Sequence, residues 1–161
     1  MDREEEFRQK LLSTYRIEAQ EHLQAIAAGL LELEKCPPAD RAAGIIETAY
    51  RDAHSLKGAS RAVNLRGVEQ VCQSLESVFS ALKKGELTAT ADLFTTLHRA
   101  VEAMAAMAPR SDGSPPSSAV SRIDPILEAL SLALRGEPGP SANVPPPGHT
   151  PTGAGEIEPA G

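Results

Sequence analysis

The chain has 161 residues, a formal net charge of −6, and an apolar content of 41% in which aromatic residues are few. No segment is densely basic, which argues against nucleic acid as a partner, because binding phosphates needs clustered Lys and Arg. No apolar run approaches the roughly 20 residues of a membrane span, and the charged N-terminus lacks the apolar core of a signal peptide. We therefore expect a cytoplasmic protein without membrane insertion. Cys36 and Cys72 are too few for a disulfide framework and are expected to be reduced thiols, with a single bridge as the alternative.

Abundant Ala and Leu favour helices, and apolar residues that recur at steps of three, four or seven predict four helices before residue 109. The predicted helices cover about residues 3–35, 41–63, 66–84 and 91–108. The predicted buried positions form one stripe on each helix. These positions are Leu12, Ala19, Leu23, Ile26, Leu30 and Leu33; Ile45, Ala49, Ala53 or Asp52, Leu56, Ser60 and Val63; Val68, Val71, Cys72, Leu75, Val78, Phe79 and Leu82; and Leu93 or Phe94, Leu97, Val101, Met104 and Ala108.

Short segments with helix-stopping or helix-capping residues separate the four helices. Proline cannot continue a helix, glycine and asparagine tolerate the left-handed conformation that closes one, and Asp and Thr side chains cap the start of one. The predicted signals are Pro37 and Pro38 after the first helix, Asp40 before the second, Asn64 after it, Gly85 after the third, and Thr88 or Thr90 before the fourth.

The composition changes after the fourth helix. Residues 109–118 are rich in Pro, Ser and Gly and predict a loop, and a fifth helix follows at about 119–135, with Asp124–Pro125 as its strongest start signal. Half of residues 136–161 are Gly or Pro, so this segment is predicted to be a flexible linker. We therefore expect one all-α domain over residues 1–135 and a linker over 136–161.

The second predicted helix carries a histidine that does not fit a purely structural pattern. At about 100° per residue, His54 lies roughly 200° from Leu56, on the side away from the predicted core. Lys57 and Gly58 follow His54 by three and four residues and therefore share its face. A glycine inside an exposed helical turn costs about 1 kcal/mol relative to alanine, but it leaves room for another molecule to approach the imidazole.

These residue types suit phosphoryl transfer. A neutral imidazole carries a lone pair on one ring nitrogen, with which His54 can attack a phosphoryl group. Lys57 can pair with phosphoryl oxygens and offset their negative charge. A carboxylate that accepts from the other ring nitrogen would fix the tautomer, and Glu76 on the third helix is the candidate if the second and third helices pack antiparallel. A lone surface histidine is usually only solvated, and that alternative stays open at this point.

The segment Ala-His-Ser-Leu-Lys-Gly-Ala-Ser-Arg-Ala-Val-Asn-Leu at residues 53–65 resembles the phosphorylation motif His-x-(Leu/Ile)-Lys-Gly of histidine-phosphotransfer domains, in particular the CheA subgroup of chemotaxis kinases. Residues 16–23 are similar to that family's first helix, and the turn at 84–87, followed by Asp92, also fits it. The resemblance covers residues 5–135. It implies an antiparallel four-helix bundle with an additional fifth, C-terminal helix.

The resemblance also implies roles for individual residues. His54 would be the phosphoacceptor through Nε2, Lys57 and Gly58 the lysine and glycine of the motif, and Glu76 the residue that orients the imidazole through its other nitrogen. Related kinases often have a second histidine at the position of Gln73, where glutamine can support a hydrogen bond but cannot titrate.

The sequence departs from the family after the motif glycine, where a Gly-rich run is replaced by Ala59, Ser60 and Arg61. These departures suggest a CheA-like or hybrid kinase outside the best-known chemotaxis group. Arg61 lies seven residues after His54 on the same face. Its position, rather than the family, makes it a candidate for binding phosphate or an acidic partner.

The implied reaction has two steps. An ATP-binding kinase domain, on the same or a sister chain, phosphorylates His54, and the phosphoryl group then passes to an aspartate of a response-regulator receiver domain, which holds Mg²⁺. The chain has no glycine-rich nucleotide loop, so we expect a phosphoryl carrier without a cofactor of its own. We also expect the isolated domain to be a monomer and its parent protein to be a protein-histidine kinase. His22, His98 and His149 lack metal-ligand spacing. The alternative is a noncatalytic helical interaction or scaffold module.

Overall fold

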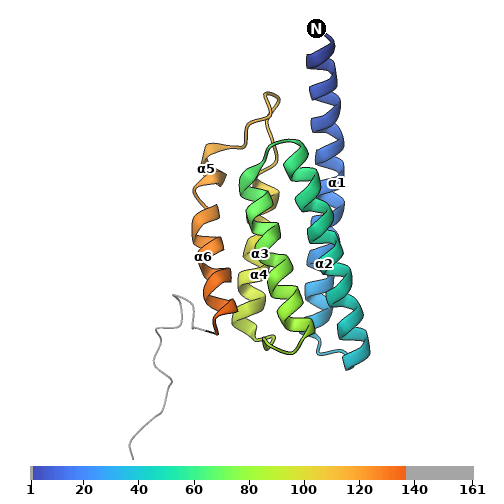
Figure 1. The fold of residues 1–161 in the computed structure, drawn as a ribbon, viewed down its shortest axis with the longest axis vertical. Coiled ribbons are helices and arrows are strands. Elements are labelled where there is room, and N and C mark those ends of the chain that lie inside the picture. The colour runs from blue at the N-terminus through green and yellow to red at the C-terminus, as the bar shows by residue number, and fades with distance from the viewer. Residues whose placement is uncertain (1, 137–161) are drawn as a thin grey trace, which may run out of the picture.

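The computed structural model describes residues 2–136, and all regular structure within them is helical (Figure 1). The predicted all-α fold, a four-helix bundle with an additional C-terminal helix, is confirmed. Residues 137–161, which hold His149 and nearly all of the predicted linker, lie outside the described residues. Over residues 2–136, no helix combines the length and apolar character that crossing a membrane requires. The helices are α1 (Arg3–Glu34), α2 (Ala39–Ala62), α3 (Arg66–Lys83), α4 (Ala91–Ala106), the single-turn α5 (Ser117–Val120) and α6 (Ile123–Leu134).

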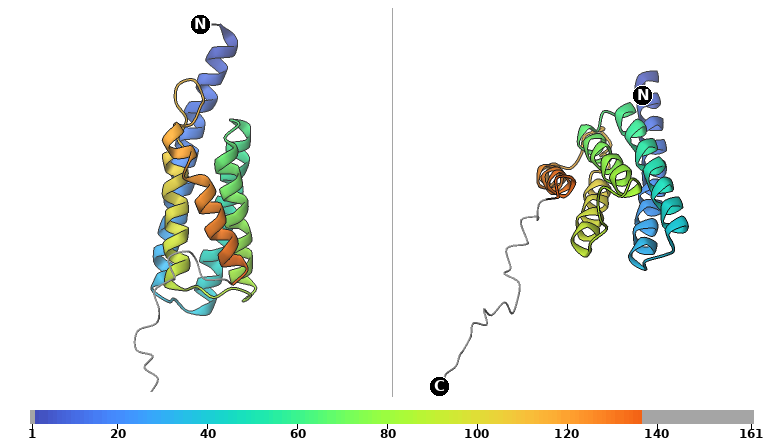
Figure 2. Two further views of the ribbon diagram at one scale, coloured as in Figure 1. Left: turned by 90° about the vertical axis from the view of Figure 1, so that its left-hand side faces the viewer. Right: turned by 60° about the horizontal axis from the view of Figure 1, so that its bottom comes forward.

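The arrangement of the helices leaves one side of the bundle open. Helix α1 packs against α2 and α4, and α3 packs against α2 and α4, which closes the four-helix bundle. Helix α6 packs against α3 and α4 (Figures 1 and 2). The first turns of α1 extend beyond the end of the bundle (Figure 1). Because α6 contacts α3 from the α4 side, it leaves most of the outer side of the α2–α3 interface uncovered, and its last residue, Leu134, borders a hollow there beside Tyr50 and Glu76.

Most of the predicted stripe residues are buried, and the buried apolar ones other than Leu12 belong to one continuous core. Leu56, Leu75 and Leu97, from three different helices, are fully buried. Ala108 was predicted in the core but is exposed, because α4 ends at Ala106 and the helical periodicity ends with it. Met107 is buried in its place.

The predicted caps are mostly confirmed. The Thr90 side chain accepts a hydrogen bond from the Leu93 amide at 3.1 Å, and Asn64 and Gly85 have left-handed φ values of 62° and 74°. Asp40 was wrongly predicted as a cap. Helix α2 begins at Ala39, two residues earlier than predicted, because the carbonyl of Pro38 already accepts from the Ala42 amide at 2.9 Å. Asp40 therefore lies in the first helical turn, where its charge interacts favourably with the helix dipole.

The predicted fifth helix was wrong as one continuous element, because the chain forms α5 and α6 with a break at residues 121–122. Pro125 lies in the first turn of α6 and has no amide hydrogen with which to bond the Ser121 carbonyl, so the helical hydrogen bond that would join α6 to the preceding turn is missing. The preceding loop is tied to α1. The Arg16 side chain donates to the Pro109 carbonyl at 2.8 Å, and the Gln9 side chain donates to the Ser111 carbonyl at 2.9 Å.

Candidate functional site

Polar side chains join α2 and α3 along the uncovered side of their interface. The two helices run antiparallel, so each step toward the start of α2 meets a residue further along α3. The pairs, in this order, are Arg61 with Glu69, Lys57 with Gln73, His54 with Glu76, and Glu47 with Lys83.

His54 lies on the solvent side of α2, as predicted. Its side chain is 64% exposed, whereas Leu56 on the opposite side of the helix is fully buried. The Nδ1 atom of His54 lies 3.1 Å from Oε1 of Glu76. The structure therefore brings together the histidine and the carboxylate that the sequence predicted as partners.

Glu76 anchors this contact from inside the bundle, where it is one of two buried polar residues in the described part of the chain. Burial acts to raise the pKa of Glu76, but the Lys57 ammonium beside the carboxylate and the hydrogen bond with His54 outweigh that effect and hold the pKa below its usual value. Glu76 is therefore ionised near neutral pH and can only accept a hydrogen bond. It follows that Nδ1 of His54 donates, and that the lone pair of the neutral ring lies on Nε2.

Lys57 faces α3 more closely than its predicted place on the exposed face suggests, since its side chain is only 17% exposed. Its ammonium donates to Oε1 of Gln73 at 3.0 Å and lies 2.6 Å from Oε2 of Glu76. The second contact has the distance of an ion pair but not the angles of a hydrogen bond. Glu76 thus holds a cation on one oxygen and the imidazole on the other.

Gly58 shows no packing reason for being glycine. A methyl group added at its α-carbon would meet no other atom within 4 Å, and the residue is exposed within α2. Because glycine lowers helix stability, its presence here fits a need for open space beside His54.

Two further residues near His54 differ from the sequence-based expectation. The guanidinium of Arg61 pairs with Glu69 at 2.7 Å, so part of its charge is already balanced within the chain. Tyr50 was missed, although its position four residues before His54 was a usable signal. Its ring lies nearly parallel to the imidazole, with an interplanar angle of 4°.

The other histidines of the described chain make separate contacts. His22 bonds Asp52 at 2.8 Å between α1 and α2, and His98 lies 3.6 Å from Glu34. Neither contact includes a lysine or arginine. Among the histidines of residues 2–136, only His54 therefore combines an exposed ring, a buried carboxylate and an adjacent cation.

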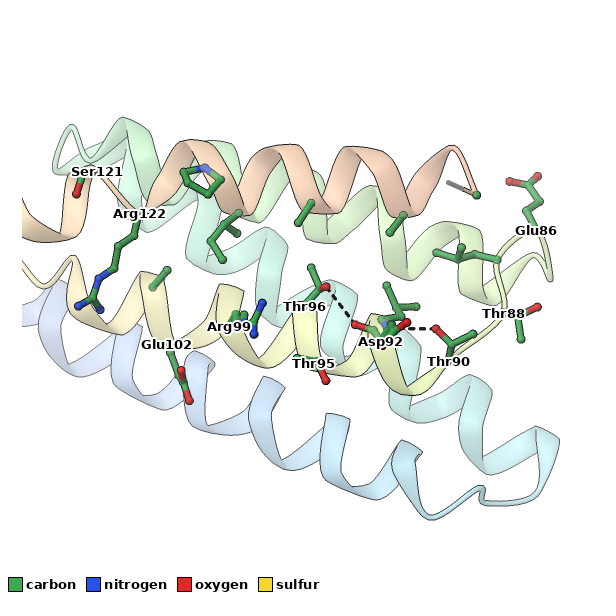
Figure 3. A pocket seen from close by; sticks show the side chains of 18 residues that line it. Glu86, Thr88, Thr90, Asp92, Thr95, Thr96, Arg99, Glu102, Ser121 and Arg122 are labelled. Carbon is green, nitrogen blue, oxygen red and sulfur yellow. Dashed lines mark hydrogen bonds between the residues drawn. The ribbon is translucent and has the colours of Figure 1, made fainter. Parts of the chain in front are cut away.

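A large hollow on the described surface lies away from His54. It has a volume of about 1000 Å³ and lies between α4 and α6 (Figure 3). Arg99, Glu102 and Arg122 border it, but no histidine or cysteine does. Since none of the predicted site residues lines this hollow, its size does not make it the candidate site.

Comparison with known proteins identifies a family and a common fold. A family model described as an Hpt domain matches residues 10–107. The chain is 28% identical over 96 residues to the sensor histidine kinase CheAY of Helicobacter pylori, and 31% identical over 90 residues to the chemotaxis protein CheA of Bacillus subtilis. These alignments cover 60% and 56% of this chain, but 12% and 13% of the two relatives. The chain therefore corresponds to a small part of each relative.

A solved structure shares the fold. It is described as the crystal structure of the phosphorylated P1 domain of CheA3 in complex with CheY6 from R. sphaeroides. The TM-score is 0.62 at 20% sequence identity, and the match covers 80% of this chain and 98% of that one.

Proposed function

Because this chain belongs to the Hpt domain family, we propose that it is a phosphoryl carrier in which His54 accepts a phosphoryl group on Nε2 and passes it on. The observation that carries this proposal is the hydrogen bond from His54 Nδ1 to the buried carboxylate of Glu76. That bond puts the lone pair on Nε2 while the side chain stays mostly exposed. The nucleophile is thus prepared and accessible before any partner arrives.

The proposed cycle consists of two transfers. In the first, the Nε2 lone pair attacks the γ-phosphorus of ATP held by a kinase domain, a nitrogen–phosphorus bond forms, and ADP leaves. In the second, a carboxylate oxygen of a receiver aspartate attacks the phosphorus, and the bond to Nε2 breaks. ATP and Mg²⁺ are bound by the partner domains in this proposal, and the chain contributes the nucleophile.

Each neighbour of His54 has a distinct task in this reaction. Phosphorylation of Nε2 places positive charge on the imidazole, and Glu76 stabilises that charge through the Nδ1 hydrogen bond. Lys57 keeps Glu76 ionised and adds a cation near the incoming phosphoryl oxygens. Gln73 accepts from the Lys57 ammonium and limits its movement. Gly58 leaves the approach to the ring open.

The proposed partners are chosen by analogy with the relatives, which are a sensor histidine kinase, a chemotaxis protein and a P1 domain in complex with CheY6. By analogy we propose an ATP-binding kinase domain of the same or a sister chain as donor, and a response-regulator receiver as acceptor. We further propose that the parent protein is a protein-histidine kinase acting in the cytoplasm, where ATP is available. The Hpt bundle itself is proposed to act as a monomer.

A labelling experiment tests the carrier function. The chain is incubated with the ATP-binding domain of the parent kinase and ATP labelled on the γ-phosphate. We expect label that is lost in acid and stable in base, as for a phosphorylated imidazole. The variant His54→Gln should take up none. The matched control is His22→Gln, because His22 also forms a hydrogen bond with a carboxylate, that of Asp52, in a contact that includes no lysine or arginine.

The outcomes separate the carrier from a scaffold module. Label on wild type and on His22→Gln, but not on His54→Gln, supports the carrier. A wild-type chain that takes up no label, or a His54→Gln variant that labels equally well, refutes it and favours a noncatalytic interaction module.

A further inference from the structure

The hydrogen bond to Glu76 fixes one atom of the imidazole but not the plane of the ring. The His54 side chain is 64% exposed, so packing does not enclose it. Among the described residues, the hydrogen bond of the ring is made by Nδ1 alone. The ring can therefore tilt about the line from Nδ1 to Oε1 without losing that bond. A second contact is needed to give the ring one orientation.

Tyr50 provides such a contact from the same helix. It lies one turn before His54, and residues four apart share a helix face. The two ring planes are 4° from parallel and their centroids are 6.5 Å apart, which is within the range of offset aromatic pairs. Tyr50 is exposed, at 38%, and borders a hollow of about 390 Å³ together with Glu76, Ser77 and Leu134. The hollow leaves open space beside the Tyr50 ring, and the aromatic contact that the structure shows for this ring is the one with His54.

We propose that Tyr50 is a positioning residue for phosphoryl transfer, because its ring sets the plane of the His54 imidazole. This inference rests on the proposed function of His54. The lone pair of a ring nitrogen lies in the ring plane, so the plane decides the direction in which Nε2 attacks. Phosphoryl transfer requires the attacking and leaving atoms to be roughly in line with phosphorus. A tilted imidazole would reach that alignment less often.

The ring of Tyr50 carries this role and its hydroxyl does not. Within residues 2–136, the hydrogen bonds formed by side chains do not involve the Tyr50 hydroxyl, whereas the ring contact to His54 is present. Tyr50→Phe keeps the ring and Tyr50→Leu removes it. These two variants therefore separate ring orientation from hydrogen bonding.

Transfer rates with two phosphoryl donors test the proposal. The first donor is the ATP-loaded kinase domain, and the second is phosphoramidate, whose phosphorus–nitrogen bond breaks with loss of ammonia as the Nε2–phosphorus bond forms. Tyr50→Phe should match wild type with both donors. Tyr50→Leu should be slower by about threefold to tenfold with both, the range expected for an aromatic pair. Phe7→Leu, which alters an exposed aromatic residue on α1, is the matched control and should change neither rate.

Two outcomes overturn the proposal from the kinetics alone. If Tyr50→Leu slows only the kinase domain and not phosphoramidate, Tyr50 contacts that partner and does not position the ring. If Tyr50→Phe is as slow as Tyr50→Leu, the hydroxyl acts and the ring does not.

Side-chain NMR gives a readout that needs no phosphoryl transfer. With ¹³C and ¹⁵N labels in histidine, the order parameter of the His54 ring should fall in Tyr50→Leu and stay at the wild-type value in Tyr50→Phe. The same spectra show that each variant is folded. Unchanged ring order in Tyr50→Leu overturns the proposal. A His54→Gln chain that labels like wild type would instead refute the carrier function, and this result is independent of ring order.

Discussion

The Nδ1 atom of His54 and the Oε1 atom of Glu76 lie 3.1 Å apart, and their contact joins an exposed ring on α2 to a buried carboxylate on α3. The exposed partner can meet other proteins, whereas the buried partner keeps its position because the bundle surrounds it. A buried carboxylate needs compensation, which the Lys57 ammonium supplies at 2.6 Å. In the proposed function, the reactivity of His54 at the surface therefore depends on the charge balance of Glu76 and Lys57 within the bundle.

Replacing Glu76 by Gln tests this dependence. Glutamine keeps the size and one acceptor oxygen but removes the negative charge that holds the Nδ1 proton. We expect phosphorylation of His54 by the kinase domain to slow by about tenfold to a hundredfold, because a hydrogen bond to a charged group contributes about 1.5–3 kcal/mol. Initial labelling rates measure the effect. Glu69→Gln, at the neighbouring pair with Arg61, is the control, and equal rates for Glu76→Gln and Glu69→Gln would contradict the proposed role.

Replacing Gly58 by Ala is expected to separate stability from transfer. No atom obstructs the new methyl group, and alanine favours a helix, so the free energy of unfolding should rise by about 0.5–1 kcal/mol. Transfer to a receiver protein should slow, since the methyl group occupies space beside His54. Urea unfolding measures the change in stability, and a time course of phosphoryl transfer to the receiver measures the change in rate.

Gly44 supplies the control for this experiment. It lies in the same helix, is exposed, and also has no atom within 4 Å of an added methyl group. Gly44→Ala should stabilise the bundle by a similar amount and leave transfer unchanged. If Gly58→Ala transfers as fast as Gly44→Ala, the open space at residue 58 has no role in partner approach.

Helical periodicity predicted the face of His54, and Glu76 was a candidate partner on the condition of antiparallel packing and by the family resemblance. Both depend on regular spacing along α2 and α3 and on a short connection that forces antiparallel packing. The ends of α2 and α3 at Asn64 and Gly85 were predictable from residue type, because asparagine and glycine tolerate the left-handed φ that both residues have here.

The sequence-based predictions were wrong or incomplete where two local signals conflict, or where the position of a side chain depends on packing against a second helix. At the start of α2, Asp40 has the side chain of a capping residue, but the backbone places Pro38 in the cap position instead. At residues 121–125, apolar periodicity suggested one helix, but the missing amide hydrogen of Pro125 divided it. The inward turn of Lys57 and the parallel ring of Tyr50 depend on packing across α2 and α3, which spacing in one helix does not specify.

The two cysteines should differ strongly in reactivity. Both are free thiols, but Cys36 is exposed and Cys72 is fully buried, with its sulfur 3.7 Å from the sulfur of Met104. Burial raises the pKa of Cys72 to about 12, and the nearby charge of Glu76 adds to this effect. Because the thiolate is the reactive form, a disulfide reagent at about pH 8 should modify one thiol quickly and the second only on unfolding. A Cys36→Ser chain should lose the fast phase, and rapid modification of both wild-type thiols would contradict the buried position of Cys72.

Acid should destabilise the bundle partly through Glu76. Burial acts to raise the pKa of Glu76, but Lys57 and His54 lower it below the ordinary value of 4.5, so the folded chain binds this proton more weakly than the unfolded chain. The resulting stabilisation is fully present above about pH 4.5 and is lost as the pH falls through the lower folded pKa. Wild type should therefore lose more free energy of unfolding than Glu76→Gln between about pH 5 and pH 3. Urea unfolding across this range measures the difference, and parallel losses in the two chains would show that the carboxylate of Glu76 is not stabilised by its neighbours.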